Sequence, residues 1–291
     1  MEANFKNVSA VLNAPAPHMV GDGFRVHNFF PSGYKIKMSP FFMLDYNAKI
    51  NFSARNEPRG VGVHPHRGFE TVTIAYHGAV AHHDSAGNSG IIYPGDVQWM
   101  TAASGILHKE YHEEQFSKQG GDFQMVQLWI NLPAKDKMSQ PKYQDVKHAE
   151  MANVELPDNA GVMEIIAGTY QGVEGSASTF SPLHLLNARM NKGGKASFSF
   201  PAHYNTGFVI IEGGIMINGN EVAVADQFVH FKNNGELIQI EALENSVVLV
   251  LSGEPIDEPI AQYGPFLMNT PEEIQQAISD YNQGKFGYLE E

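Results

Sequence analysis

Three histidines and two carboxylates stand in two short segments of this chain that have the composition of β-strands. The first segment carries His64, His66 and Glu70, and the second carries His108 and Glu110. Because alternate residues of a strand point to the same face, we expect His64, His66 and Glu70 to share a face of one strand. His108 and Glu110 should share a face of another. If the two strands are neighbours in a barrel, all five side chains converge on one point inside it.

Imidazole and carboxylate groups together form a ligand set suited to iron, manganese, nickel, copper or zinc. The chain contains no cysteine, which excludes disulfides and thiolate chemistry and leaves metal binding to these two kinds of group. Four protein ligands on an octahedral metal would leave positions open for water, a bidentate substrate or dioxygen. A closed, four-coordinate structural zinc site is the alternative, and the residue types alone do not decide between the two.

The composition limits the kinds of partner that the protein can have. The 291 residues fit one large domain or two of ordinary size. The formal net charge of -13, without a basic cluster, disfavours direct binding of nucleic acid. No apolar run approaches the ~18 residues of a membrane span, and the N-terminus lacks the apolar region of a secretory signal. We therefore expect a cytoplasmic monomer that contacts neither membrane nor nucleic acid.

Short strand-like runs recur along the chain and are separated by glycine, proline, asparagine and aspartate. Clear examples are residues 71–75, 125–130, 208–211 and 247–251. Many short strands with turn signals between them predict a sandwich or barrel architecture. The polar, proline-containing stretch from residue 134 to residue 161 is the best candidate for a linker.

The two halves of the chain are weakly alike, which indicates one barrel unit used twice. In the second half, His203 is the single histidine near the expected ligand position. Asn205 stands where a second ligand would be. We therefore expect the metal chemistry in the first half and no metal in the second.

The remaining histidines have no partner at ligand spacing. His82 and His83 lie in a polar run that contains glycine, which predicts a solvated loop. His77 has the wrong strand parity to join His64 and His66.

A helix is predicted near the end of the chain, from about residue 271 to residue 283. Thr270 serves as N-cap, Pro271 occupies the first helical position, and Glu273 completes a capping box. Apolar residues at helical spacing follow, and Gly284 ends the helix. We expect this helix to pack on a barrel as a structural support.

The segment around the first histidine pair resembles the signature of the pirins, a branch of the cupin superfamily. It spans residues 64–71, and similar matches cover residues 94–102, 105–110, 127–132 and 263–270. The resemblance implies an all-β bicupin fold, in which two jelly-roll β-barrels pack face to face and a short C-terminal helix follows. Residues 1–145 would form the metal-bearing barrel, and residues 146–291 would form the second barrel and the helix.

The resemblance also implies one divalent transition metal per chain, with iron as the usual ion. The residues that match the pirin ligands are His64, His66, His108 and Glu110. Generic cupins instead take their carboxylate from the position of Glu70. The resemblance favours Glu110 as the ligand, so that Glu70 would orient a histidine or a bound water.

Several pirins resemble quercetinases, so the resemblance implies a quercetin 2,3-dioxygenase activity. Such an enzyme cleaves the ring of a flavonol with dioxygen and releases carbon monoxide. Glu110 or Glu70 is expected to act as base, because a carboxyl in an apolar barrel has a raised pKa. Candidate pocket walls, which serve equally well as ordinary core, are Phe41, Phe42, Phe69, Trp99 and Met125.

The alternative function is that of an iron-dependent, redox-sensing regulator. Some pirins resemble proteins that bind a transcription factor or a metabolic enzyme. A change in the charge of the iron would alter a protein-binding surface near the site. Of the two functions, the sequence favours the dioxygenase, with a small aromatic substrate such as a flavonol.

Overall fold

The computed structural model describes residues 4–30 and 37–291. Strands dominate these residues, and every pairing between two named strands is antiparallel. The described chain divides into two compact units. We call them the N-terminal unit, made of residues 16–29, 41–148 and 256–291, and the C-terminal unit, made of residues 4–15, 30, 37–40 and 149–255.

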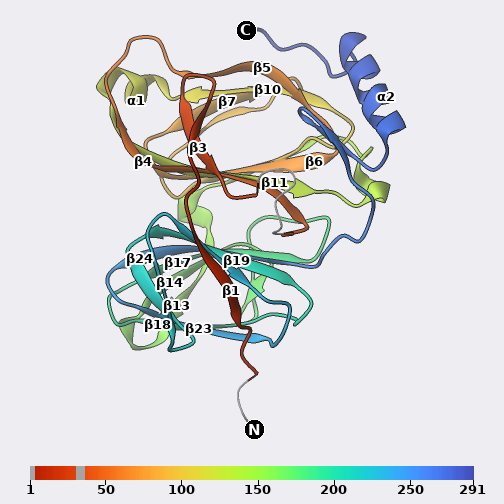
Figure 1. The fold of residues 1–291 in the computed structure, drawn as a ribbon. Helices are drawn as coiled ribbons and strands as arrows, with labels where there is room; N and C mark the ends of the chain where they lie inside the picture. Colours follow the sequence, from red (N-terminus) through yellow and green to blue (C-terminus); the bar gives the residue numbers. More distant parts are fainter. Residues whose placement is uncertain (1–3, 31–36) are drawn as a thin grey trace. The chain divides into compact units, whose positions relative to one another are not determined.

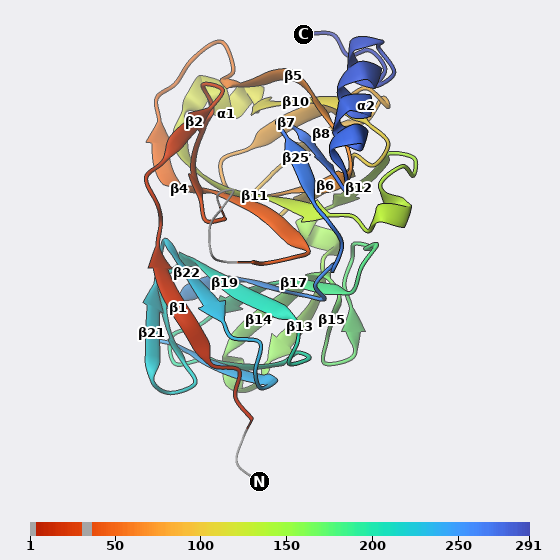
Figure 2. The same cartoon turned by 45° about the vertical axis from the view of Figure 1, so that its right-hand side comes forward.

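The N-terminal unit contains two main sheets, which form two layers in Figures 1 and 2. The seven-stranded sheet has the order β12-β9-β6-β11-β4-β3-β2, and the four-stranded sheet has the order β5-β10-β7-β8. The strands of the unit, with a further pair β25–β26, are β2 (His18–Val20), β3 (Phe24–Asn28), β4 (Phe41–Phe52), β5 (Gly60–His66), β6 (Phe69–His77), β7 (Val80–Asp84), β8 (Ser89–Ile92), β9 (Val97–Thr101), β10 (Ile106–His112), β11 (Gly121–Asn131), β12 (Lys142–Val146), β25 (Ala261–Tyr263) and β26 (Phe266–Met268).

The C-terminal unit also contains a seven-stranded and a four-stranded sheet, with orders β1-β22-β19-β24-β17-β14-β13 and β18-β23-β20-β21. This shared pattern agrees with the expected use of one barrel unit twice. Its strands, with a further pair β15–β16, are β1 (Val8–Asn13), β13 (Ala152–Leu156), β14 (Gly161–Ala167), β15 (Thr169–Tyr170), β16 (Val173–Glu174), β17 (Leu183–Met190), β18 (Lys195–Ser199), β19 (Asn205–Glu212), β20 (Gly214–Ile217), β21 (Glu221–Val224), β22 (Gln227–Phe231), β23 (Leu237–Ala242) and β24 (Ser246–Gly253).

Each unit has its own apolar core. In the C-terminal unit, buried aromatic and aliphatic side chains, among them Phe208 and Phe231, fill the space between the sheets. In the N-terminal unit, Phe24, Phe123 and Met125 belong to a smaller apolar cluster. The smaller cluster leaves the interior of the N-terminal unit with many buried polar side chains.

Two α-helices belong to the N-terminal unit, α1 (Glu114–Gln119) and α2 (Pro271–Asn282). The predicted C-terminal helix is therefore confirmed. The capping box is formed, because Thr270 Oγ1 accepts a hydrogen bond from the Glu273 amide and the Glu273 carboxylate accepts one from the Thr270 amide. No helix among the described residues is long and apolar enough to span a membrane.

The two units are not consecutive stretches of chain. Strand β1 pairs with β22 and so belongs to the C-terminal unit. Helix α2 belongs to the N-terminal unit because its buried residues Ile274 and Ala277 pack with Leu107 of β10. The first residues of the chain, 4–15, thus belong to the C-terminal unit, and the last residues, 256–291, belong to the N-terminal unit. The domain boundary between residues 145 and 146 stays a prediction. The chain passes between units at residues 148–149, inside the expected linker, although that stretch also contains β12 and β13.

The expectation of a solvated loop at His82 and His83 is wrong. Both residues lie in β7, and only 1% of His82 is exposed. The Tyr143 hydroxyl lies 2.9 Å from His82 Nε2, and the Tyr111 hydroxyl lies 3.0 Å from His83 Nδ1. The polar sequence predicted exposure, but each imidazole is paired with a tyrosine hydroxyl. This pairing reduces the free-energy cost of burying the imidazole in a strand.

Candidate metal centre

Strands β5 and β10 bring three histidines together. They pair antiparallel, so that His64 lies directly opposite His108 and His66 lies opposite Ile106. Between His108 and Glu110 the register shifts, because two residues of β5 face the single residue Lys109. Such a bulge re-aims side chains locally and is common beside functional sites. The two strands thus place His64, His66 and His108 around one point.

The geometry of the three histidines fits a metal ion. One ring nitrogen from each lies within 4.8 Å of the corresponding nitrogens of the other two. The ring centroids are 4.9 Å apart for His64 and His66, 4.2 Å for His64 and His108, and 4.6 Å for His66 and His108. The sequence expectation that these three side chains converge agrees with this arrangement.

The protonation states of these rings also suit metal binding. His64 Nδ1 lies 2.8 Å from the Gly62 carbonyl oxygen, so Nδ1 carries the N–H that donates and Nε2 is the nitrogen left to bind a metal. Burial lowers the pKa of both His66 and His108, and the neighbouring His64 lowers it further. Both rings are therefore neutral, which is the form that ligates metals.

Several of the ring nitrogens are buried and unpaired. His66 Nδ1 and both ring nitrogens of His108 have no hydrogen-bond partner among the described residues. A buried polar atom without a partner costs about 1–3 kcal/mol. A cation that accepts the lone pair of one nitrogen from each imidazole would account for one such atom in each of these two rings, so the residues present fit a bound metal.

Glu110 lies beside this cluster but is not one of its three members. Its carboxylate accepts hydrogen bonds from Thr73 Oγ1 at 3.1 Å and from Gln127 Nε2 at 2.8 Å. Burial raises the pKa of the Glu110 carboxyl, while Gln127, His64 and Thr73 act in the opposite direction. Glu110 and His64 line the same pocket, so the carboxylate faces the space next to the histidines.

Glu70 lies elsewhere, and the expectation of one continuous strand through His64, His66 and Glu70 is wrong. The strand breaks before β6 at Gly68, whose φ is +90° and where a Cβ would come within 2.0 Å of the Leu267 carbonyl oxygen. Consequently β5 and β6 belong to different sheets.

Glu70 also points away from the histidines. By strand alternation it lies on the face of β6 opposite to Phe69, which contacts His66. Its carboxylate accepts a hydrogen bond from Thr101 Oγ1 at 2.7 Å, and burial raises its pKa to about 7. The structure therefore does not bring Glu70 to the three histidines.

A pocket opens beside His64 and Glu110. Water-sized molecules can occupy about 30 Å³ of it, which is room for roughly two waters. Its lining combines five apolar and four polar side chains, namely Val20, Phe24, Val26, Val61 and Met125 with Asp45, His64, Glu110 and Gln127. A larger ligand would enter only if the surrounding side chains moved.

Aromatic side chains pack against the histidines. Phe69 stacks on Trp129 with ring centroids 4.2 Å apart, and the two rings lie 5.0 and 5.3 Å from the His66 ring. Phe69 and Met125 were expected near the site. Trp99 is opposite Val72 in register, on the Glu70 face, and does not line this pocket. Trp129, which was not among the expected pocket residues, packs against His66.

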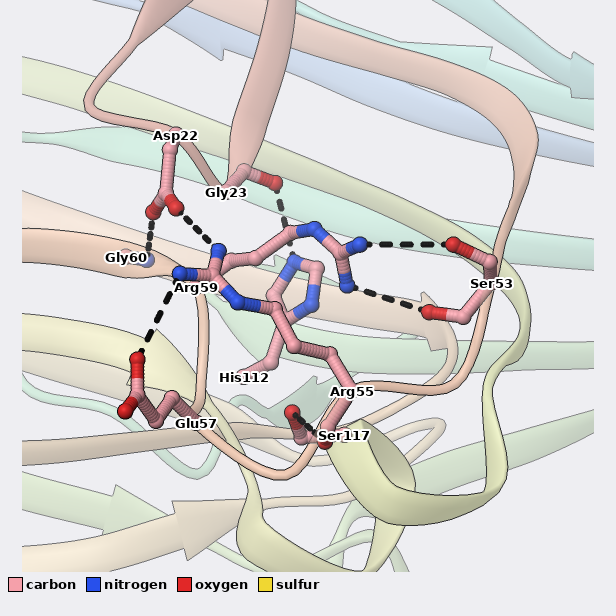
Figure 3. Close-up of polar contacts among 9 residues, drawn as sticks. All are labelled: Asp22, Gly23, Ser53, Arg55, Glu57, Arg59, Gly60, His112 and Ser117. Carbon is pink, nitrogen blue, oxygen red and sulfur yellow. Dashed lines mark hydrogen bonds and ion pairs between the residues drawn. The ribbon is translucent and has the colours of Figure 1, made fainter.

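The hairpin of β2 and β3 supplies one wall of the pocket, through Val20, Phe24 and Val26. Figure 3 shows how its tip is held. Asp22 accepts a hydrogen bond from the Gly60 amide at 2.8 Å and one from Arg55 Nη1 at 2.5 Å. His112 Nε2 lies 2.9 Å from the Gly23 carbonyl oxygen. The tip is thus fastened to the start of β5, the strand that carries His64.

Helix α2 supports the other end of β5. Arg67 directly follows His66 and is almost fully buried. It donates hydrogen bonds from Nη1 to Asp280 of α2 at 2.9 Å and from Nε to the Ser104 carbonyl oxygen at 2.7 Å. Arg67 thus links the C-terminal helix to the end of β5 and to the residues just before β10.

Sequence reasoning missed several residues of the site. Asp45 of β4 and Thr73 of β6 lie in no motif, and Gln127 and Trp129 of β11 lie in the matched stretch 127–132 but were given no role at the site. Strand parity from Phe69 would have placed Thr73 on the inner face, but nothing in the sequence pairs Gln127 with Glu110. In the C-terminal unit, His203 is exposed and lies 3.7 Å from Glu254, and Asn205 Nδ2 donates to the Ser39 carbonyl oxygen. The absence of a metal there stays a prediction.

Two models of known protein families match this chain. The pirin family model matches residues 23–130, and the model of the pirin C-terminal cupin domain matches residues 185–287. The chain belongs to the pirin family. The expected bicupin fold is thereby confirmed, with one cupin domain in each half of this pirin.

Similar proteins are known from bacteria and from humans. A Pseudomonas aeruginosa protein with the name "Putative quercetin 2,3-dioxygenase" is 46% identical over 282 residues, which cover 97% of this pirin and 98% of the relative. The Homo sapiens protein named Pirin is 34% identical, over 92% of this chain and 90% of its own length.

Solved structures show the same fold. A crystal structure of quercetin 2,3-dioxygenase from Acinetobacter baumannii superposes with a TM-score of 0.92 at 43% identity, and covers 98% of this chain and 99% of its own. A bacterial pirin from Escherichia coli, solved in complex with nickel(II), has a TM-score of 0.66 at 20% identity, over 85% of this chain and 99% of its own. The second similarity concerns the fold alone.

Proposed function

We propose that this pirin is a metal-dependent dioxygenase of the quercetin 2,3-dioxygenase type. Its reaction would cleave the heterocyclic ring of a flavonol with dioxygen and release carbon monoxide. The observation that carries the proposal is the convergence of three histidines, of which His66 and His108 are buried and neutral, beside a pocket with partly apolar walls. The names of the Pseudomonas and Acinetobacter proteins support the choice of substrate.

The proposed ligands of a single divalent transition metal are His64, His66, His108 and Glu110. Iron is the first candidate, and manganese, nickel, copper and zinc are the alternatives, because imidazole and carboxylate suit all of them. When bound, the metal supplies a Lewis acid for the deprotonated substrate oxygen and, in the case of iron, a redox partner for dioxygen.

The side chains around the ligands have separate tasks in this proposal. Thr73 and Gln127 hold the Glu110 carboxylate in one orientation through their hydrogen bonds. Phe24, Val26 and Met125 supply apolar walls that would pack against the planar ring of a flavonol once the β2–β3 hairpin has moved to admit it. The Phe69–Trp129 stack packs against the His66 ring and limits its movement.

The two carboxylates expected as bases differ in their suitability. Glu70 lies on the far face of β6 and would not reach a substrate beside His64. Glu110 faces the pocket, but one of its oxygens accepts from Thr73 and the other from Gln127. We therefore assign Glu110 to metal binding and leave Glu70 outside the reaction.

Aerobic incubation of the iron-loaded protein with quercetin tests the proposal. We expect loss of the flavonol absorbance together with release of carbon monoxide. The control is His66→Ala, which removes a proposed ligand and should lose both signals. Turnover no faster than that of the control would reject flavonol cleavage. It would then favour the regulator, which can be tested by comparing protein partners captured with ferrous and ferric protein.

A further inference from the structure

A second carboxylate faces the same pocket. Asp45 lies in the middle of β4, with Gln127 of β11 as its cross-strand neighbour on one side and Asn28 of β3 on the other. It lines the pocket together with His64 and Glu110, and only 6% of the residue is exposed. Neither the histidine motif nor the proposed ligand set uses this group.

One oxygen of Asp45 is available for a new hydrogen bond. The Asn28 side chain hydrogen-bonds to the carboxylate, but Asp45 Oδ1 is buried and has no partner in the part of the chain that the structure describes. Leaving a buried acceptor unpaired is costly, so a hydroxyl donor placed in the pocket would bind favourably there. The oxygens of Glu110, in contrast, already accept from Thr73 and Gln127.

We propose that Asp45 is the general base that removes the proton from the 3-hydroxyl group of the bound flavonol. The inference rests on the proposed function. In this step the substrate O–H bond breaks, an O–H bond forms at Asp45 Oδ1, and the electron pair stays on the substrate oxygen. The flavonol becomes an anion and Asp45 becomes a neutral acid. Asp45 gives the proton to solvent when the ring-opened product leaves, which restores the base.

The electrostatic surroundings of Asp45 suit this task. Burial raises the pKa of its carboxyl to about 6, while His18 of β2 and the hydrogen bond from Asn28 act in the opposite direction. The other titratable groups that face it across the pocket are His64 of β5 and Glu110 of β10, and its neighbour Gln127 is uncharged. General bases are most effective when their pKa lies near the working pH.

The variant Asp45→Asn tests the assignment, because it keeps the shape of the side chain and removes the basic oxygen. We expect kcat/KM for quercetin to fall by roughly 10²- to 10⁴-fold, the usual contribution of a positioned base. In the wild type, kcat/KM should fall as the pH drops below about 6, since Asp45 must be ionised. This acidic limb should be absent in the variant.

A second readout does not depend on turnover. Zinc-loaded protein is mixed with quercetin without oxygen, and the absorbance of the bound flavonol shows its protonation state. The wild type should bind the anion at neutral pH, and Asp45→Asn should bind the neutral flavonol. The matched control is Asp122→Asn, which changes an exposed carboxylate at the far end of the same strand pair and should behave as wild type.

The possible outcomes separate this inference from the proposed function. If the wild type cleaves quercetin and Asp45→Asn does so with unchanged kcat/KM and the same acidic limb, the assignment of Asp45 is wrong and the function stands. If Asp45→Asn loses its metal in elemental analysis, its role is structural and the assignment is also wrong. If the wild type neither binds nor cleaves the flavonol, the proposed function is wrong, and the assignment of Asp45 as its base is rejected as well.

Discussion

Glu70 and Glu110 show how two buried carboxyls of one unit acquire different roles. Both have pKa values raised by burial, but Glu70 lies on β6 of the seven-stranded sheet and Glu110 lies on β10 of the four-stranded sheet. Strand parity within two separate sequence motifs predicted that both would lie near the histidines. The backbone conformation at Gly68 instead takes Glu70 away from the histidines. We therefore expect the raised pKa of Glu70 to affect the stability of the fold and not the proposed reaction.

Glu70 should make the protein less stable as the pH rises. Its pKa is about 7 in the folded state against an ordinary value of 4.5, so the folded protein holds this proton more tightly. The stabilisation is complete below pH 4.5 and is lost as the pH rises through 7. The shift corresponds to on the order of 3 kcal/mol. In Glu70→Gln, which stays uncharged, the Tm should fall less between pH 5 and pH 8 than in the wild type. Equal falls would show that Glu70 is not the group responsible.

At the level of single residues, the sequence was sufficient to predict that the three histidines converge. It was not sufficient to predict which side chains surround them. The alternation of His64 and His66 is a local property of one strand, and His108 follows from a second motif of the same kind. Asp45 and Gln127 become neighbours only through the pairing of β4 with β11. Such long-range register cannot be derived from the local pattern of either strand.

At the level of elements, the hairpin of β2 and β3 forms one wall of the pocket but is only weakly attached to its sheet. It lies at the edge of its sheet, and β3 is in register with β4 only at His27 and Asn28. Its tip depends on Asp22, which bonds to Gly60 and Arg55. The small pocket behind it means that a flavonol would have to displace this wall.

Removing the carboxylate charge at the tip should loosen the hairpin. For Asp22→Asn we expect amide hydrogen exchange of residues 18–28 to become roughly fivefold faster, the equivalent of one hydrogen bond worth about 1 kcal/mol. The measurement is exchange followed by mass spectrometry of peptides from this segment. The control is Glu57→Gln, because Glu57 also pairs with Arg55, at 3.8 Å, but does not bond to the hairpin. Equal exchange in both variants would contradict the role given to Asp22.

The elements also differ in how far sequence alone predicts them. Helix α2 was predicted with its capping box because Thr270, Pro271 and Glu273 act within one turn. The break between β5 and β6 was missed, because Gly68 is needed there for a positive φ and for the close approach of Leu267 from a distant part of the chain. The capping signals within one turn were reliable, whereas contacts between distant parts of the chain were not visible in the sequence.

At the scale of the whole molecule, repeated short strands were enough to predict two β-rich units, and the family match confirms a bicupin. The exchange of the terminal segments was not foreseen. It follows from the pairing of β1 with β22 and from the packing of α2 near Leu107, both of which join distant parts of the chain. The helix thereby supports, through the Arg67–Asp280 contact, the strand that carries the proposed ligands.

The metal content of the purified, metal-loaded protein tests the central claim most directly. Elemental analysis after removal of free metal is compared between the wild type and His108→Ala, with circular dichroism to confirm that both are folded. We predict a single metal ion per chain in the wild type and its loss in the folded variant, because both buried nitrogens of His108 lack a partner among the described residues. A folded wild type that binds no metal, or a variant that retains it, would contradict the account.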